Sequence, residues 1–231
     1  MVELIFDQVY YQYPKAKKET LCGVSAVFPA GRTTSIVGQS GAGKSTLLYL
    51  ISGLDTPKSG EIRLDGKVLQ VKDLDDYRRN TVATISQSYL LFPTRTALEN
   101  VMYPMQLAKT DKQEAIGEAR KYLLSVGISE ELHDRFPSKL SGGEQQRVAI
   151  ARCLAAHSPI IAADEPTGNL DEENAREVMR ILTDLAHNYG KTVIIVTHDR
   201  VLAEETDIQY RLAYGKLLEV RTDDDNVNLD I

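Results

Sequence analysis

Between positions 38 and 45 the 231-residue chain reads Gly38-Gln39-Ser40-Gly41-Ala42-Gly43-Lys44-Ser45. This is the pattern G-x-x-x-x-G-K-S, placed after the β-branched run Thr33–Val37 and before an apolar helical pattern that begins near Thr46. In such a loop the glycines turn backbone amides toward phosphates, the lysine reaches the β and γ oxygens, and the serine can bind magnesium. A glycine turn that merely begins a helix would not need all of these positions. The sequence therefore predicts a nucleotide-binding loop, with Thr46 at its helical end, in an α/β fold.

The segments around this loop predict a parallel sheet covered by helices. The helix after the loop has a 3.6-residue apolar period, and its apolar positions are Leu47, Leu48, Ile51 and Leu54. Apolar runs at Ile160–Asp164 and Thr192–Thr197 predict buried strands, and Asp171 is placed to cap a helix between them. The apolar stripe of that helix is Ala175, Val178, Met179, Leu182, Leu185 and Ala186. A strand, a helix and a strand in this order form a crossover unit.

Other parts of the chain add antiparallel strands and a helical region. Residues 5–9 and 24–28 are β-rich, and residues 208–213 and 216–220 flank Tyr214 and Gly215 as a predicted hairpin. From about residue 87 to 136 the pattern becomes helical, with Thr110 and Gln113 at capping-box spacing. The expected stripe of that helix is Ile116, Ala119, Leu123 and Val126, with Gly127 ending it.

A pair of acidic residues, Asp164 and Glu165, follows the predicted buried strand directly. Ligands of α/β sheets gather at the carboxyl ends of strands, so Asp164 is expected in the magnesium shell and Glu165 facing the attacking water. A solvated acidic pair that closes a strand would be the simpler interpretation of these two residues alone. The phosphate loop favours the functional interpretation, because it independently predicts a strand-end aspartate.

A second glycine-rich segment reads Leu140-Ser141-Gly142-Gly143-Glu144-Gln145. Ser141 and Glu144 are three residues apart and form a capping box at the start of a helix. Two glycines at a helix start also make an anion site that no side chain obstructs. Since the chain already has one phosphate loop, we expect residues 141–143 to serve the nucleotide of a neighbouring subunit.

Composition excludes several classes of protein. The net charge of −6 gives no overall basic surface for nucleic acid, so no nucleic-acid partner is expected. Cys22 and Cys153 lack metal or redox spacing and are expected to be reduced core thiols. No apolar run is long enough to span a bilayer, and residues 222–231 are expected to form an acidic tail.

Taken together and in this order, the motifs resemble those of ABC transporter ATPases over nearly the whole chain. The matching positions are the phosphate loop, Gln87 after Val82–Ile85, the signature segment 140–145, Asp164 with Glu165, residues 169–171, and His198 after a strand. The resemblance implies a single domain over residues 1–221. It would have a P-loop core with a parallel sheet, an antiparallel β subdomain and a helical insert at about residues 88–158.

The resemblance also implies cofactors, partners and roles. ATP and Mg²⁺ would bind in a head-to-tail homodimer, each ATP lying between the phosphate loop of one chain and residues 141–143 of the other. A separate integral membrane subunit would be the second partner, with the chain peripheral on the cytoplasmic face of the cell membrane. Glu165 would be the general base, His198 would hold the γ-phosphate and the water, and Gln87 would join Ser45 and Asp164 at magnesium. Tyr13 matches the adenine-stacking aromatic, and Tyr11 is the rival.

Within the family, four segments resemble the subgroup that includes lipoprotein release, macrolide export and cell division: residues 52–55, 91–94, 97–101 and 166–170. Ser86, Tyr89 and Arg95 depart from that subgroup's usual pattern, and they lie on the segment that faces the partner. The predicted function is ATP hydrolysis that drives export or extracytoplasmic work. The alternatives are a signalling or division complex, a nutrient importer, and a soluble ABC ATPase, which would normally carry a coiled-coil insertion, a second motor domain or basic extensions.

Overall fold

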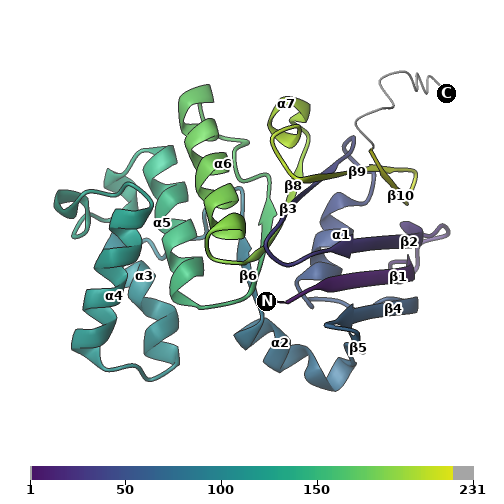
Figure 1. Cartoon of the computed structure of the whole chain (residues 1–231), viewed down its shortest axis with the longest axis horizontal. Helices are drawn as coiled ribbons and strands as arrows, with labels where there is room; N and C mark the ends of the chain where they lie inside the picture. The colour runs from purple at the N-terminus through teal and green to yellow at the C-terminus, as the bar shows by residue number, and fades with distance from the viewer. Residues whose placement is uncertain (1, 221–231) are drawn as a thin grey trace.

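A computed structural model describes residues 2–220 of the chain, and its centre is a six-stranded sheet (Figure 1). The strand order is β10-β9-β3-β8-β7-β6, and all neighbouring pairs are parallel except β10 with β9. The bounds are β3 (Thr33–Val37), β6 (Val82–Ile85), β7 (Ile160–Asp164), β8 (Thr192–Thr197), β9 (Ile208–Ala213) and β10 (Lys216–Glu219). The two predicted buried strands and the terminal hairpin are confirmed.

A second, antiparallel sheet packs beside the first in the order β2-β1-β4-β5. Its strands are β1 (Leu4–Tyr11), β2 (Leu21–Phe28), β4 (Ser59–Leu64) and β5 (Lys67–Val68). The sequence pattern indicated only the middle of β1 and the end of β2. It gave no sign of β4 and β5, because Ile62 is the only buried residue in these two strands, so they lack an apolar alternation.

Helices pack on both faces of the central sheet (Figure 1). The longer ones are α1 (Lys44–Ile51), α3 (Ala97–Leu107), α4 (Lys112–Ser125), α5 (Gly142–Ala155) and α6 (Glu172–His187). The short ones are α2 (Leu74–Asn80), α7 (Arg200–Ala203) and the 3-10 turns η1 (Val71–Asp73), η2 (Glu130–Leu132) and η3 (Pro137–Lys139). Helices α3, α4 and α5 pack on one another within the segment that joins β6 to β7.

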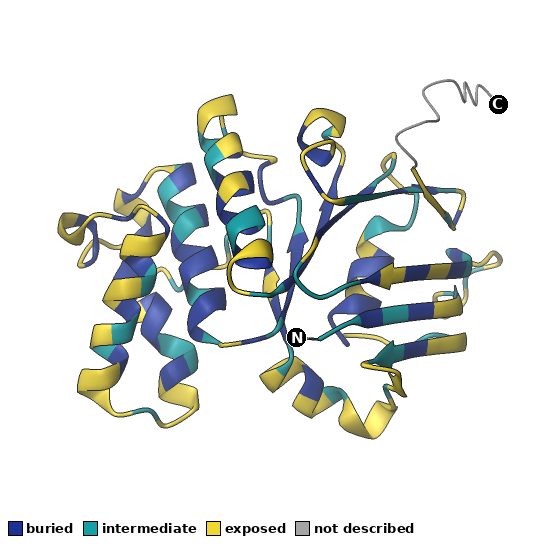
Figure 2. Cartoon of the chain, viewed as in Figure 1, coloured by how far each residue is buried: buried dark blue, intermediate teal, exposed yellow. Residues whose placement is uncertain are grey.

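The central strands are buried on both faces and separate two cores, seen as dark blue strands in Figure 2. Ile161 and Val193 belong to the core that includes α3 to α6, whereas Ile160 and Ile194 belong to the core that includes α1 and the antiparallel sheet. This division follows from the two-residue period of a strand, which directs successive side chains to opposite faces. Parallel strands buried in this way hold their carboxyl ends rigidly at one edge.

The predicted boundary of α4 was wrong by one residue. Asp111, not Thr110, is the N-cap, and its carboxylate accepts from the amides of Gln113 and Glu114 at 2.8 and 3.2 Å. A charged carboxylate is a better acceptor than a hydroxyl at the positive end of a helix, which explains the choice. Gly127, at φ 76°, lies just beyond the end of this helix, as predicted.

The predicted apolar stripes hold for most positions. The stripe of α6 is buried throughout, and Asp171 caps this helix by accepting from the Asn174 amide. Leu54 does not extend the stripe of α1, because the helix ends at Ile51 and Leu54 is 61% exposed. In α4 the buried residues are Ala115, Ala119 and Leu123, whereas Ile116 of the predicted stripe is only partly buried.

Cys153 is a buried free thiol, but Cys22 is only half-buried, so it is not a full core residue. None of the helices within residues 2–220 combines the length and apolar character needed to cross a membrane. The expected acidic tail, residues 222–231, lies outside the described part of the chain.

Candidate nucleotide-binding and hydrolysis site

Four adjacent strands bring the predicted site residues to one edge of the central sheet. The phosphate loop follows β3, His198 follows β8, Asp164 ends β7, and Gln87 follows β6. These strands are neighbours in the order β3-β8-β7-β6 and are parallel, so their carboxyl ends lie side by side. The sequence placed each residue after a strand but could not give the strand order that joins them.

The phosphate loop is closed on itself by its own lysine. Lys44 donates from Nζ to the carbonyl oxygens of Gly38 and Gln39 at 2.8 and 3.2 Å. Gly43, at φ 105°, lets the chain turn into α1 in a conformation that residues with a side chain rarely adopt. The loop thus presents a cation and the amino end of a helix at one point, an arrangement that favours binding of phosphate.

Asp164 lies half-buried at the end of β7, close to both Glu165 and Lys44. Burial raises the pKa of its carboxyl, the negative charge of Glu165 raises it further, and Lys44 opposes both effects. A carboxylate that loses hydration in this way gains strongly from a cation placed next to it. Asp164 and the Ser45 hydroxyl, at the start of α1, are oxygen donors of the kind that magnesium prefers.

Glu165 and His198 form a hydrogen-bonded pair that sequence reasoning did not predict. Glu165 Oε2 lies 2.8 Å from His198 Nδ1 and also accepts from the His198 amide at 3.2 Å. The glutamate side chain is only 14% exposed, whereas that of the histidine is 67% exposed. Glu165 has φ 45°, and its amide donates to the Val196 carbonyl at 2.8 Å. Strand β8 therefore fixes the position of this carboxylate.

Gln87 lies just beyond β6, with its backbone tied to the loop that follows Glu165. The Gln87 carbonyl accepts from Asn169 Nδ2 at 3.0 Å. The Gln87 side chain reaches the backbone of Gly168, where an added Cβ would lie 3.0 Å from Nε2. Gln87 is itself exposed. Its amide group thus lies near Glu165 and remains accessible to solvent.

The two candidate adenine-stacking tyrosines have different surroundings. Tyr11 is 5% exposed and donates its hydroxyl to Asp55, and burial, with help from Asp55, raises its pKa to about 12. Tyr13 is 40% exposed, and its hydroxyl is hydrogen-bonded to Thr46 Oγ1 at 2.9 Å. The two rings meet edge to face at 5.0 Å. Only Tyr13 combines an exposed ring with a direct contact to the helix that follows the phosphate loop.

The signature residues lie in a different part of the chain's structure. Ser141 accepts from the Glu144 amide at 3.3 Å, and Glu144 accepts from the Ser141 amide at 2.6 Å, so the predicted capping box is confirmed. Helix α5 packs against α3, α4 and α6, whereas α1 packs against β7 and β8. Within residues 2–220 no hydrogen bond joins residues 141–143 to the phosphate loop.

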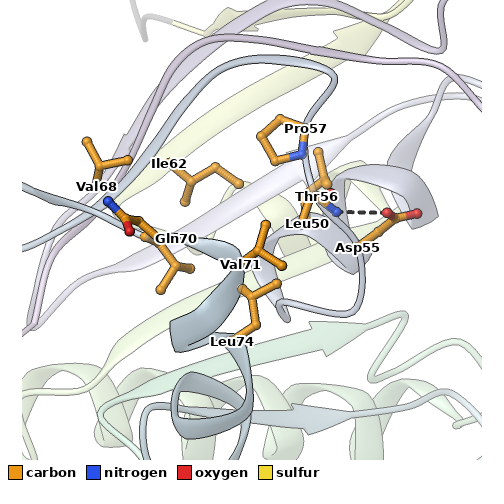
Figure 3. A pocket seen from close by; sticks show the side chains of 10 residues that line it. Leu50, Asp55, Thr56, Pro57, Ile62, Val68, Gln70, Val71 and Leu74 are labelled. Atoms are coloured by element: carbon orange, nitrogen blue, oxygen red, sulfur yellow. Dashed lines mark hydrogen bonds between the residues drawn. The ribbon is translucent and has the colours of Figure 1, made fainter.

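A pocket of about 340 Å³ lies elsewhere, between α1, β4 and the start of α2 (Figure 3). Figure 3 shows Leu50, Ile62 and Leu74 facing it, beside a hydrogen bond from the Thr56 amide to Asp55. The described residues that line this pocket include none of the phosphate loop. It does not form part of the candidate site.

Comparison with known proteins agrees with this geometry. The ABC transporter family matches residues 21–168, which span the phosphate loop, the signature segment and the acidic pair. The chain belongs to this family, as an ATP-binding subunit. As an ABC ATPase it binds and hydrolyses ATP.

Relatives and solved structures match this ABC ATPase over nearly their full length. It is 41% identical to an uncharacterized ABC transporter ATP-binding protein, YclH, of Bacillus subtilis, covering 92% of this chain and 94% of the relative. It is also 41% identical to the lipoprotein-releasing system ATP-binding protein LolD of Syntrophotalea carbinolica, covering 86% and 88%. The fold matches a dimeric post-hydrolysis structure of the cassette MJ0796 bound to ADP and Pi, with a TM-score of 0.83, 34% identity, and coverage of 94% and 99%. The predicted fold class, with its antiparallel β part and its helical part, is confirmed.

Proposed function

We propose that this ABC ATPase works as a head-to-tail homodimer that drives a separate integral membrane subunit, for export or extracytoplasmic mechanical work. The observation that carries the proposal is the separation of two anion sites in one chain. The phosphate loop begins α1, and residues 141–143 begin α5, which packs with different helices. A second copy of the chain can bring its own α5 to the ATP of the first.

In this proposal the phosphates are held by the loop of one chain and the signature of the other. The amides of residues 38–46 surround the phosphates, and Lys44 exchanges its carbonyl partners for the β and γ oxygens. Ser141, Gly142 and Gly143 of the second chain approach from the opposite side. Adenine stacks on Tyr13, whose exposed ring lies next to Thr46.

Glu165 acts as the general base and His198 assists it. The hydrogen bond at 2.8 Å orients the carboxylate, which accepts a proton from water as the γ-phosphoryl group is attacked. The exposed imidazole of His198 is placed to contact the γ-phosphate and the water.

The donors at the strand ends fit a magnesium ion bound with ATP. Ser45, Asp164 and the Gln87 amide would hold it, and when bound it supplies positive charge to the β and γ oxygens. The raised pKa of Asp164 supports this assignment, because a half-buried carboxylate next to Glu165 is stabilised by a bound cation. Within residues 2–220 no three His, Cys, Asp or Glu side chains form a metal cluster. Magnesium normally completes its shell with phosphate oxygens and water.

The resemblance to LolD supports export or extracytoplasmic work as the outcome of hydrolysis. We place the protein on the cytoplasmic face of the cell membrane, with residues 1–221 as one domain and residues 88–158 as its helical insert. The dimeric MJ0796 structure supports the homodimer. A signalling or cell-division complex would use the same ATPase with a membrane partner, and it would differ in that ATP drives a conformational change without transport.

Two experiments test the proposal. The Glu165→Gln variant should form an ATP-dependent dimer, measured by light scattering after size exclusion. If it stays monomeric at saturating ATP while still binding ATP, the shared site is wrong. Purification of the chain from its native membrane should yield a partner with few spanning helices and a large extracytoplasmic domain. Recovery of a many-helix partner together with a solute-binding protein would indicate an importer.

A further inference from the structure

Tyr89 contacts helix α5 near both of its ends. In the last turn of α5, Arg152 donates from Nη1 to the Leu90 carbonyl at 2.7 Å and from Nη2 to the Tyr89 carbonyl at 3.1 Å. At the first turn, the space next to Gly142 is filled by the Tyr89 hydroxyl, and a Cβ added there would lie 2.9 Å from it. Gly142 and Arg152 are separated by about 15 Å along the helix axis at 1.5 Å per residue, and the side chains of Arg152 and Tyr89 together bridge this length.

The backbone of the turn after Gln87 is held in an unfavourable conformation. Tyr89 and Leu90 have φ values of 60° and 49°, so two consecutive residues with side chains are left-handed. The half-buried guanidinium of Arg152 satisfies both carbonyls of this turn, and it also lies 5.9 Å from the centre of the Phe92 ring. The hydrogen bonds from Arg152 therefore tie this strained turn to α5 and stabilise it.

Tyr89 and Gly142 meet by steric packing and not through a hydrogen bond. No hydrogen bond found within residues 2–220 uses the Tyr89 hydroxyl, and Gly142 offers only backbone at this point. Cβ atoms essentially never come within 3.0 Å of another heavy atom, so a side chain at position 142 would displace Tyr89 or the start of α5. Glycine at 142 and tyrosine at 89 are therefore complementary.

We infer that Tyr89 is a positioning residue that couples the turn after Gln87 to Gly142, so that this turn sets how the chain presents residues 141–143 to its partner's ATP. The inference rests on the proposed shared site. A helix is rigid along its axis, and both contacts of Tyr89 are on the same helix. The turn therefore cannot move without shifting α5 or breaking one of the two contacts. Gln87 lies two residues before Tyr89, so the coupling links the magnesium end of one site to the signature of the other.

A double-mutant cycle between Tyr89→Phe and Gly142→Ala tests this coupling. Both changes are made in the Glu165→Gln chain, and the ATP concentration for half-maximal dimerisation is measured. We expect Gly142→Ala to raise that concentration about 10-fold when Tyr89 is present and about 3-fold or less with Tyr89→Phe, within the usual range for residues in contact. ATP affinity of the isolated monomer should change by less than about twofold, because neither residue touches the chain's own phosphate loop.

Steady-state kinetics give a second measurement. In the chain with Glu165 intact, Tyr89→Phe should lower kcat about threefold and leave KM nearly unchanged, because it loosens only the closed state. Two variants serve as matched controls. Gly117→Ala adds a Cβ into open space on α4, and Tyr103→Phe removes a hydroxyl from the ring that packs on Phe92. The effect of Gly117→Ala should not depend on Tyr89→Phe, and the effect of Gly142→Ala should not depend on Tyr103→Phe.

These experiments distinguish failure of the positioning role of Tyr89 from failure of the shared ATP site. If the Glu165→Gln chain dimerises normally with ATP but Gly142→Ala costs the same with and without Tyr89→Phe, the positioning role is overturned and the shared site stands. An equal effect of Tyr103→Phe on kcat would also overturn it. If the Glu165→Gln chain does not dimerise with ATP at all, the shared site and this inference fail together.

Discussion

Glu165 Oε2 lies 2.8 Å from His198 Nδ1, across two neighbouring parallel strands of the central sheet. The glutamate follows the last residue of β7 and the histidine follows the last residue of β8. The register between β7 and β8 brings Glu165 and His198 together, because Asp164 is opposite Val196 and the Glu165 amide donates to the Val196 carbonyl. One strand thus sets the position of the base that the other strand carries.

The Glu165→Gln variant should keep ATP affinity and lose turnover. An amide can still hold water but cannot accept its proton, so kcat should fall roughly 10²- to 10⁴-fold. Phosphate release and equilibrium ATP binding measure the two effects. Near-normal turnover would reduce Glu165 to a structural role in the loop after β7.

The His198→Ala variant removes both a γ-phosphate donor and the partner of Glu165. We expect kcat to fall by about 10²-fold or more. The kcat of His198→Gln should fall between those of the unmodified chain and His198→Ala, because an amide can replace either the hydrogen bond to Glu165 or the one to the γ-phosphate but not both. If His198→Ala retained full kcat, the 2.8 Å bond would have no catalytic importance.

The Lys44→Ala variant should lose productive binding of Mg-ATP. The lysine is the only cation with a hydrogen bond to the loop carbonyls of Gly38 and Gln39 within residues 2–220, so the phosphates would lose their nearest positive charge. Isothermal titration with Mg-ATP measures the loss, and circular dichroism checks the fold. Unchanged affinity together with unchanged turnover would refute the loop assignment.

Tyr13→Ala and Tyr11→Phe should have separate effects. Loss of the exposed Tyr13 ring removes stacking worth about 1 to 3 kcal/mol, by analogy with aromatic stacking on nucleic-acid bases. Tyr11→Phe removes a buried hydroxyl that binds Asp55, so it should lower stability by about 1 kcal/mol and leave ATP affinity unchanged. ATP titration and urea unfolding of both variants distinguish these results. Because phenylalanine keeps the ring, Tyr11→Ala tests the rival assignment: loss of ATP affinity in Tyr11→Ala but not in Tyr13→Ala would assign stacking to Tyr11.

Asp207 should make a pH-dependent contribution to stability. Burial acts to raise its pKa, but hydrogen bonds from Thr33, His187 and Arg32 outweigh this and lower it to about 2. Because the folded-state pKa is lowered, the stabilisation is complete above the unfolded value near 4 and is lost as the pH falls toward 2.

Asp207→Asn should therefore cost about 2 kcal/mol of unfolding free energy at pH 7, and the difference from the unmodified chain should shrink below about pH 4. Urea unfolding over this range measures it. Asp184→Asn on α6 is a control whose carboxylate is more exposed and paired with Arg180. A pH-independent difference for Asp207→Asn would show that its ionisation is not responsible.

The sequence predicted the central sheet well because its strands and α6 have strong apolar periods. It predicted less where burial is slight, as in β4 and β5, or where two capping residues compete, as at Thr110 and Asp111. Each catalytic candidate could be named because it follows a recognisable strand. The Glu165–His198 bond and the contact of Tyr89 with Gly142 could not, because they depend on strand order and helix packing.

The position of β3 between β8 and β9 also determines when the ATP site can form during synthesis. The phosphate loop is made early, yet its first glycine lies against the Leu212 carbonyl of β9, where an added Cβ would be only 2.5 Å away. A nascent chain that has not yet reached β8 has neither of the strands that flank β3, and one that has not extended past β9 lacks one of them. Its phosphate loop therefore lacks rigid support on at least one side, although the whole motif is already present. We conclude that the site is completed only after most of the chain has left the ribosome.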